Sequence, residues 1–263
     1  MKISVYIIAF NEADKIRDCI NSVLWADEII VADSNSTDGT TEIAESLGAK
    51  VVHIPFDGYG NLRNKAISYC TKDWILSLDS DERCTEATRD EILTLINETS
   101  SDIFHIPRKN YFMGKWIKHS GWYPNYRQPQ LFRSGKMSYD LKPVHEGYIS
   151  HSEKKIGVIK NTIWQFPFKN TEEIIYKANR YSTLGVKKLQ DRGINGSVFK
   201  GFIHGIWSFL KHYIFKLGFL DGGAGFVIAF GNFEGTFYRY VKLSEVQADW
   251  KPPKSNIIKK INK

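Results

Sequence analysis

Two aspartates, Asp79 and Asp81, stand one residue apart directly after the largely apolar run Trp74–Leu78. Asp and Ser are common turn residues, so one interpretation is a buried strand that ends in a solvated turn. Carboxylates are also hard oxygen ligands, and Mg²⁺ or Mn²⁺ held by them is usually shared with substrate phosphates. The D-x-D spacing alone does not separate the turn from a metal site, so the rest of the chain must decide.

Further polar residues follow other apolar runs in the first hundred positions. They include Asn11 and Glu12, then Asp33, and Arg63 in a stretch with helical character. Taken singly, each is best explained as a solvated loop residue. Gathered at one edge of a sheet they would suit a nucleotide-sugar, since carboxylates accept hydrogen bonds from uracil and ribose. A divalent ion on Asp81 would neutralise the diphosphate, and Arg63 would add a fixed positive charge.

The elements that must position these residues alternate between strand and helix. Near-continuous apolar runs predict buried parallel strands, at residues 2–10, 28–34, 49–55 and 74–80. Helical patterns follow them, at residues 13–24, 36–48, 59–70 and 85–97. We expect Thr85 to be an N-cap and Gly48 a C-cap. Four alternations predict a doubly wound α/β sheet, in which strand ends share one crevice that binds ligands.

The second half of the chain has a different rhythm. Residues 102–168 contain short β-like runs rich in Trp, Tyr, Pro and Gly, which indicate a mixed sheet with long loops. A helical pattern returns over residues 171–190. We therefore expect a catalytic domain over residues 1–195, with a nucleotide-binding half at 1–100 and an acceptor half at 101–168. A separate C-terminal region would cover residues 196–263.

Composition limits the classes of function. The chain has 263 residues, of which 42% are hydrophobic, so a sizeable core is expected. Its three cysteines are an odd number without metal-like spacing, which favours a reducing compartment, and Cys19 falls among core positions. The first residues already resemble a strand, so we expect no signal peptide, and no apolar stretch is long enough to predict a spanning helix. Neither a G-x-G-x-x-G strand–helix turn nor a P-loop motif is present, which disfavours a dinucleotide-binding domain and a P-loop enzyme.

The positive charge lies almost entirely at the C-terminal end. The net charge is +7, and residues 196–263 alone carry 10 basic and 4 acidic residues. Counted at 100° per residue, residues 200–217 form an amphipathic helix with a stripe of basic and polar residues opposite aromatic and aliphatic ones. It is either a helix that faces the core or one that lies in a membrane interface, where the basic tail would attract anionic lipid. Nucleic acid binding is disfavoured, because no recognised motif accompanies the charge.

Several segments in order resemble family 2 glycosyltransferases of the GT-A fold. They are "YIIAFNE", "IIVADSNSTDGT", "GYGNLRNKAI", "WILSLDSDE" and "VHEG", which together span about residues 1–150. Bacterial lipopolysaccharide-core glucosyltransferases are similar over most of the chain, because they share the helix "KANRYS" and a downstream "GFLDGGAGF". The resemblance implies a mixed, Rossmann-like sheet with helices on both faces, a nucleotide-sugar donor and a Mg²⁺ or Mn²⁺ cofactor.

The resemblance also implies roles for single residues. The predicted nucleotide-sugar contacts are Ala9, Asn11, Glu12, Asp33 at the uracil, Arg63, Asp79 at the ribose, and Arg133. Asp81 would bind the metal, with His145 as a second candidate ligand, and Glu146 in "PVHEG" would be the catalytic base. The family often has Arg where this chain has Gln130, so either Arg127 or Arg133 would supply that charge. His145 could equally contact the acceptor or serve the structure.

The resulting hypothesis is an inverting, metal-dependent hexosyltransferase. Its donor would be UDP-glucose, and its acceptor a lipopolysaccharide or lipooligosaccharide core, or another lipid-linked glycan, at the cytoplasmic face of the inner membrane. One alternative is transfer of a different sugar to a polyprenyl-linked or capsular glycan. Another is a non-catalytic nucleotide-sugar or glycolipid binding protein on the same fold. The presence of Asp79, Asp81 and Glu146 argues against this last alternative.

Overall fold

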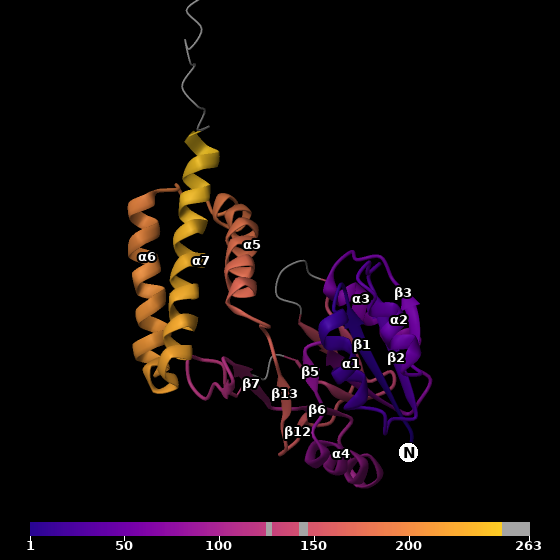
Figure 1. Ribbon diagram of the computed structural model, residues 1–263. Coiled ribbons are helices and arrows are strands. Elements are labelled where there is room, and N and C mark those ends of the chain that lie inside the picture. Colours follow the sequence, from indigo (N-terminus) through magenta and orange to yellow (C-terminus); the bar gives the residue numbers. More distant parts are fainter. Residues whose placement is uncertain (125–127, 142–146, 249–263) are drawn as a thin grey trace, which may run out of the picture. The chain divides into compact units, whose positions relative to one another are not determined.

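The computed structural model describes residues 1–124, 128–141 and 147–248, and these form two compact units. The first unit contains Met1–Lys118 and Trp122–Pro167, and the second contains His119–Gly121 and the chain from Phe168 onward. Figure 1 shows their strands and helices. The units divide the chain at residue 168 rather than at the predicted residue 195. The difference arises because the helix that follows Pro167 packs within the second unit.

The predicted doubly wound sheet is confirmed. In the described part of the chain its seven strands have the order β12-β6-β9-β4-β1-β2-β3. The four parallel strands at its centre and one side are β1 (Ile3–Ala9), β2 (Glu28–Asp33), β3 (Lys50–His53) and β4 (Trp74–Asp79). Strand β9 (Leu131–Arg133) is antiparallel to both β4 and β6 (Ile103–His105), and β12 (Gly157–Val158) is parallel to β6.

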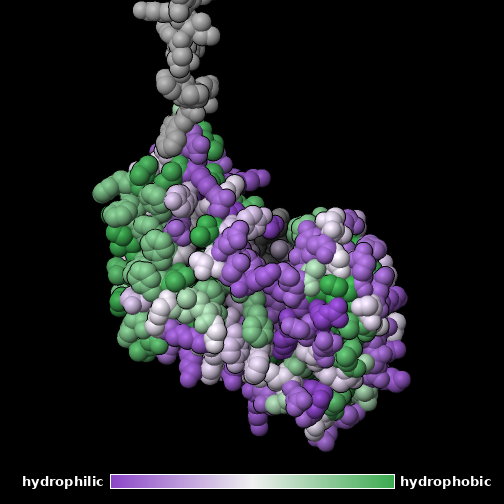
Figure 2. Space-filling model, viewed as in Figure 1, coloured by the Kyte–Doolittle hydropathy of each residue, from purple (hydrophilic) through white to green (hydrophobic). Residues whose placement is uncertain are grey.

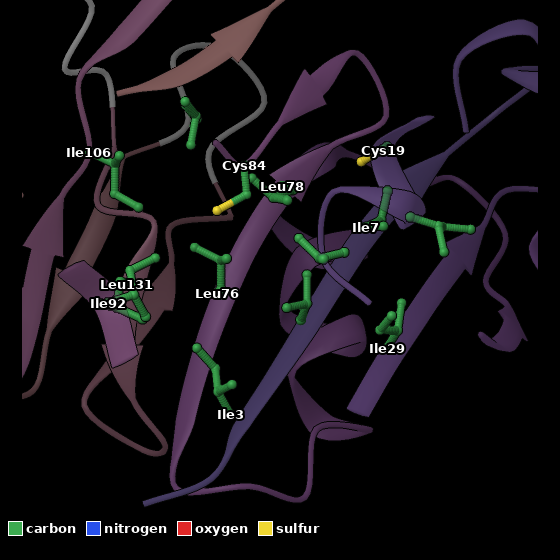
Figure 3. Close-up of a cluster of buried hydrophobic side chains, with 14 of the residues drawn as sticks. Ile3, Ile7, Cys19, Ile29, Leu76, Leu78, Cys84, Ile92, Ile106 and Leu131 are labelled. Atoms are coloured by element: carbon green, nitrogen blue, oxygen red, sulfur yellow. The ribbon is translucent and has the colours of Figure 1, made fainter. Parts of the chain in front are cut away.

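Helices cover both faces of this sheet, as its apolar runs require. On one face, strand residues pack with α1 (Ala13–Asn21), α2 (Thr40–Ser46) and α4 (Glu86–Glu98). Figure 3 shows this cluster, in which Ile7 and Leu78 of the strands lie among Cys19 and Ile92 of the helices. The other face packs against α3 (Tyr59–Ser68) and the hairpin of β10 (Met137–Tyr139) and β11 (Tyr148–Ser150). The predicted cap is also confirmed, since Thr85 accepts a hydrogen bond from the Thr88 amide.

A smaller, four-stranded sheet is connected to the central one through the short turn after β4. Its described strands are β5 (Glu82–Arg83), β7 (Arg108–Phe112), β8 (Lys115–Trp116) and β13 (Ile163–Gln165), in the order β5-β13-β7-β8. Strand β5 follows β4 after only two residues, so the chain passes from the central sheet to the small one through Ser80 and Asp81. The D-x-D motif therefore occupies the junction of two sheets.

The second unit is built around one long helix. Its elements are α5 (Thr171–Gln190), α6 (Val198–Leu210), a π-helical turn η1 (Lys211–Phe215), a 3₁₀ turn η2 (Gly218–Asp221) and α7 (Gly222–Ala248). Both α5 and α6 pack on α7. Among the described residues, no single helix has both the length and the apolar character of a membrane span. The segments Val198–Phe215 and Gly218–Ala248 reach that length and apolar character only when taken together, and the chain bends by 70° between them.

Candidate active site

The carboxyl ends of β1, β2 and β4 lie side by side at one edge of the central sheet. In the strand register, Ala9 is opposite Asp33 and Ile8 is opposite Asp79. Neighbouring strands are about 4.8 Å apart, so these ends form one continuous row. We call this row, with Arg63 of α3, the polar edge. In the strand order, β2 and β3 lie on one side of β1 and β4 lies on the other, so the direction of the chain connections reverses at β1. Open α/β sheets bind ligands at such a reversal.

Asp33 is fully buried at the polar edge, and its carboxylate is held by the turn that follows β2. The Ser36 amide donates to Asp33 Oδ2 at 2.9 Å, the Ser36 hydroxyl donates to Oδ1, and His53 Nδ1 lies 3.4 Å from Oδ2. A carboxylate has about four acceptor positions, so it can also accept a donor from a ligand. The turn therefore fixes the direction in which Asp33 presents its oxygens.

The loop after β1 is fastened to the loop after β2. The Asn11 amide donates to Ser36 Oγ at 2.8 Å, and the Thr37 amide donates to Asn11 Oδ1 at 2.9 Å. Asn11 has φ of 54°, in the left-handed region that Asn tolerates better than most residues. The next amide, that of Glu12, donates to Thr40 Oγ1 at 2.9 Å. These bonds make a fixed rim beside Asp33.

Arg63 and Asp79 form an ion pair at the centre of the polar edge. Arg63 Nη2 lies 2.6 Å from Asp79 Oδ1, and Nη1 donates to Ser77 Oγ at 3.2 Å. The guanidinium also lies over the Tyr139 ring, 5.4 Å from its centroid. Burial acts to lower the pKa of Arg63, but the Asp79 carboxylate together with Tyr139 and Tyr6 raises the pKa well above its usual value. The polar edge thus holds a charged guanidinium that is paired with the Asp79 carboxylate.

Beneath this pair lies a buried carboxylate that the sequence analysis did not single out. Glu82 is 0% exposed. It accepts the Asp79 amide at 2.9 Å and Gln130 Nε2 at 3.0 Å through Oε2, and Arg108 Nε through Oε1. Burial and the carboxylates of Asp79 and Asp81 raise its pKa to about 7, against the opposing effect of Arg108. Glu82 therefore fixes the backbone from which Asp79 projects. The available signal was a third acidic residue directly after the D-x-D motif.

The presence of Gln130, where the resembled family often has arginine, has a structural explanation. Gln130 is 3% exposed, and besides Glu82 its Nε2 faces the Ser77 carbonyl at 3.3 Å. The Gln130 side chain therefore contacts Ser77 and Glu82, the residues that flank the D-x-D motif, below the polar edge. An arginine at this position would bring a second guanidinium to Glu82, which Arg108 already contacts. Gln130 can donate to the same carboxylate without adding charge.

Asp81 lies on the turn between the two sheets and is partly buried. Gln165 Nε2 of β13 lies 3.2 Å from its Oδ1 and 3.4 Å from Oδ2, and the Phe166 amide donates to its carbonyl at 2.9 Å. The described residues include no group of three or more His, Cys, Asp or Glu side chains that could hold a metal ion. Mg²⁺ commonly takes one or two carboxylates and completes its shell with water and substrate phosphates. The pair of Asp79 and Asp81 fits such a partial set of ligands.

Arg133 does not join the polar edge. It lies on β9, opposite Trp74 at the amino end of β4, because β9 runs antiparallel to β4. Asp79 lies five positions further along β4 than Trp74, a distance of roughly 16 Å. Arg133 Nε lies 3.1 Å from Asp102 Oδ1, and its guanidinium lies 4.6 Å from the Trp74 ring centroid. The predicted diphosphate contact by Arg133 thus has no support from its position.

Three predicted residues, Glu146, His145 and Arg127, lie outside the described residues. The chain on either side of Glu146 is described. The Asp140 amide donates to the Gly147 carbonyl at 3.0 Å, and the preceding residue, Tyr139, carries the ring beneath Arg63. Asn64 of α3 holds Tyr139 on both sides, with bonds of 2.8 Å and 2.9 Å to its amide and carbonyl. The described residues next to this gap, Tyr139 to Asp140 and Gly147, are therefore held against α3 beside Arg63.

Comparison with known proteins decides the family. The family model "Glycosyl transferase family 2" matches residues 4–149, which include every described part of the polar edge. The chain belongs to glycosyl transferase family 2. Membership of this family favours an enzyme over a binding protein, and the matched residues contain the whole described polar edge.

Relatives of this family 2 transferase match it beyond the residues that the family model covers. An uncharacterized glycosyltransferase of Rickettsia felis is 32% identical over 93% of this chain and 90% of its own length. The lipopolysaccharide core biosynthesis glycosyltransferase LpsC of Rhizobium meliloti is 29% identical over 88% of this chain and 90% of its own. Both alignments cover too much of the chain to be confined to residues 4–149. The helical unit is therefore shared with these relatives.

A solved structure supports the GT-A fold of this transferase. The structure of S. aureus TarS 1–349 in complex with UDP-GlcNAc has a TM-score of 0.51 to this chain, at 17% identity. The superposition covers 95% of this chain and 92% of that one. At this identity, the likeness establishes the fold alone.

Proposed function

We propose that this family 2 transferase is an inverting, metal-dependent hexosyltransferase that moves glucose from UDP-glucose to a lipopolysaccharide core or another lipid-linked glycan. The observation that carries the proposal is the polar edge. It combines a buried, oriented carboxylate at Asp33, a charged guanidinium at Arg63, and the carboxylates of Asp79 and Asp81. A nucleoside diphosphate sugar requires this combination of acceptors and positive charge along a single row.

Each residue of the polar edge has a proposed task. Asp33 accepts the uracil N–H, and the rim made by Asn11 and Glu12 closes one side of the base. Asp79 accepts from the ribose hydroxyls, while Arg63 holds its carboxylate in place and adds positive charge near the diphosphate. A divalent cation, Mg²⁺ or Mn²⁺, held by Asp81 with Asp79 would supply the charge that stabilises the departing diphosphate.

The chemical step needs one general base and no covalent intermediate. We assign the base to Glu146, which takes the proton from the acceptor hydroxyl as its oxygen attacks the sugar C1. The bond from C1 to the diphosphate oxygen breaks in the same displacement, and UDP leaves. Attack from the face opposite the leaving group inverts the anomeric centre, so an α-linked donor gives a β-linked product.

The acceptor proposal is supported by the likeness to LpsC, which is named for lipopolysaccharide core biosynthesis and aligns with 88% of this chain. We place the reaction at the cytoplasmic face of the inner membrane, where a lipid-linked glycan would meet a nucleotide-sugar. Transfer of another sugar to a polyprenyl-linked or capsular glycan is the remaining candidate reaction.

The test is a two-step assay on the full chain. A panel of nucleotide-sugars with Mn²⁺ is first screened for thermal stabilisation, since a ligand that binds only the folded state raises its stability. Donors that bind are then offered with truncated lipopolysaccharide cores or polyprenyl-linked glycans, and the product anomer is determined by NMR coupling constants. UDP-glucose and a β-linked core product are expected. A product that retains the α configuration would refute the inverting mechanism, and preference for a different donor would reassign the sugar.

A further inference from the structure

Helix α6 presents its large apolar side chains outward and its small residues inward. Gly201 and Gly205 are buried against α7, whereas most large apolar residues of α6 and η1 are exposed, with Trp207 at 57%. Phe209 and Tyr213 are the partly buried exceptions, and both contact Phe226 of α7. Figure 2 shows this hydrophobic surface over α6. We call it the outward face, and its residues are 37% to 72% exposed: Phe199, Phe202, Ile203, Ile206, Trp207, Leu210, Ile214 and Phe215.

The inward orientation of the glycines is fixed by how closely the helices approach. A Cβ atom on Gly201 would lie 2.9 Å from the Phe237 carbonyl oxygen, and one on Gly205 would lie 2.8 Å from the Phe233 ring. The residue that comes later in α6 contacts the residue that comes earlier in α7, so the two helices run antiparallel. Only the glycine face of α6 can make this contact, so α6 cannot rotate its apolar face inward without separating the helices.

This arrangement is the reverse of an amphipathic helix in water, which turns its apolar face to the core. The largest apolar patch on a soluble monomer usually covers about 300–600 Å². The four aromatic side chains of the outward face each present about 150–250 Å² when open, so at their exposures they alone give on the order of 500 Å². Four exposed aliphatic side chains add to this area. Close packing through small residues, with apolar side chains outside, is instead typical of helices that contact lipid.

The charges around the outward face indicate which lipid would cover it. Residues 192–220 include Arg192, Lys200, Lys211 and Lys216 and no acidic residue. The next acidic side chain, Asp221, is buried and accepts the His119 amide at 3.1 Å and the Ser120 hydroxyl at 2.9 Å. Residues 250–263 add five lysines and no acidic residue. The basic residues of this segment would therefore attract an anionic bilayer, and α6 itself has no acidic residue that would repel it.

We propose that the outward face is a membrane-docking surface that lies in the interfacial layer of an anionic bilayer. The thirteen residues of α6 span only about 20 Å, less than the ~30 Å hydrocarbon core, so α6 suits a position along the interface. Trp207 fits this layer, because its ring is apolar and its N–H can reach water or head groups. The inference goes beyond the sugar transfer and does not depend on which donor or acceptor is used.

The experiment is cosedimentation of the full chain with vesicles of phosphatidylcholine containing 30% phosphatidylglycerol, and with phosphatidylcholine alone. The test variant combines Phe199→Ser, Trp207→Ser and Phe215→Ser, three exposed residues whose loss should leave the fold intact. A matched control combines Leu24→Ser, Leu93→Ser and Val158→Ser, which are exposed apolar residues of the first unit. Melting temperature, oligomeric state by light scattering and the thermal shift with UDP and Mn²⁺ are recorded for each protein.

We expect the wild type and the control to bind anionic vesicles, and the test variant to lose at least tenfold in affinity while it keeps its melting temperature. Equal binding by the test variant and the wild type would overturn the assignment of the surface. A wild type that ignores both kinds of vesicle would overturn the proposal. So would a wild-type dimer that becomes a monomer in the test variant, because a second copy would then cover the face. A missing UDP shift beside intact vesicle binding would instead count against the proposed donor.

Discussion

The polar edge and the outward face place opposite kinds of side chain at the surface. At the polar edge, apolar residues are covered on both faces of the sheet, and the charged groups that remain are held by one another and by Glu82 beneath them. On the outward face, the small residues are covered and the large apolar ones remain. The first arrangement suits a charged small molecule, and the second suits an apolar phase. Function is indicated in one region by the charged groups gathered at the strand ends, and in the other by the apolar side chains that the fold leaves uncovered.

The largest expected effect comes from removing a carboxylate of the polar edge. Asp81→Ala takes away a predicted metal ligand, so transfer should fall by at least ~10³-fold, as expected for loss of charge stabilisation at the leaving group. Asp73→Asn at the other end of β4 is the control and should transfer normally. Steady-state kinetics on both variants make the test. If Asp81→Ala kept more than a tenth of the activity, the polar edge would lose its central role.

The second effect separates stability from chemistry beneath the polar edge. Glu82→Ala removes the buried carboxylate that Arg108 contacts, and breaking a buried ion pair in this way should lower the free energy of unfolding by about 3–5 kcal/mol. Replacing both residues by Leu should restore most of that stability, because a well-packed apolar pair avoids the desolvation cost. Transfer should stay low in the double variant, since the Asp79 amide still lacks its acceptor. Recovery of activity together with stability would show that Glu82 serves the fold alone.

A third prediction concerns close packing in the helical unit. A Cβ atom on Gly225 would lie 1.8 Å from the Gly218 carbonyl oxygen, whereas one on Gly223 of the same helix would meet nothing within 4 Å. Gly225→Ala should therefore destabilise the unit by about 1–3 kcal/mol, as overpacking does. Gly223→Ala should be neutral or stabilise by up to ~1 kcal/mol through helix propensity. Thermal melts followed by circular dichroism compare the two, and equal melting temperatures would contradict the glycine-mediated contact.

The smallest effect is electrostatic and belongs to the outward face. Lys200→Glu with Lys211→Glu should weaken binding to anionic vesicles by about tenfold or more, since each basic group near such a surface contributes ~1 kcal/mol. Lys136→Glu with Lys155→Glu in the first unit makes the same change in net charge and should have little effect. Added salt should weaken wild-type binding in the same direction. Similar losses in both double variants would point to net charge rather than to α6.

The sequence indicated the polar edge well because each strand there is an apolar run that stops at a polar residue. Parallel pairing then brings Asp33 and Asp79 together without any long-range detail. Local signals also worked: α5 begins and ends where the helical pattern does, at Thr171 and Gln190. The helix over residues 13–24 was predicted three residues too long, since α1 ends at Asn21.

The features that the sequence could not predict depend on which strands pair and on which side chains other elements cover. Arg133 follows Gln130 closely along the chain, but the antiparallel direction of β9 carries it away from Asp79. Glu82 has the residue type of a solvated turn, and its burial follows from its contact with Arg108, 26 residues away. The helical pattern of α6 identified an apolar side without showing which side α7 covers. Two glycines decided that question, because they permit the closest approach.

The most direct test of the account is calorimetric titration of UDP into the full chain, with Mn²⁺ and with a chelator, for the wild type and for Asp81→Ala. We expect the wild type to bind UDP tightly only with Mn²⁺, and Asp81→Ala to bind UDP weakly with or without the ion. Binding by the wild type that is unchanged by the chelator, or normal Mn²⁺-dependent binding by Asp81→Ala, would contradict the assignment of the polar edge as a metal-assisted nucleotide-sugar site.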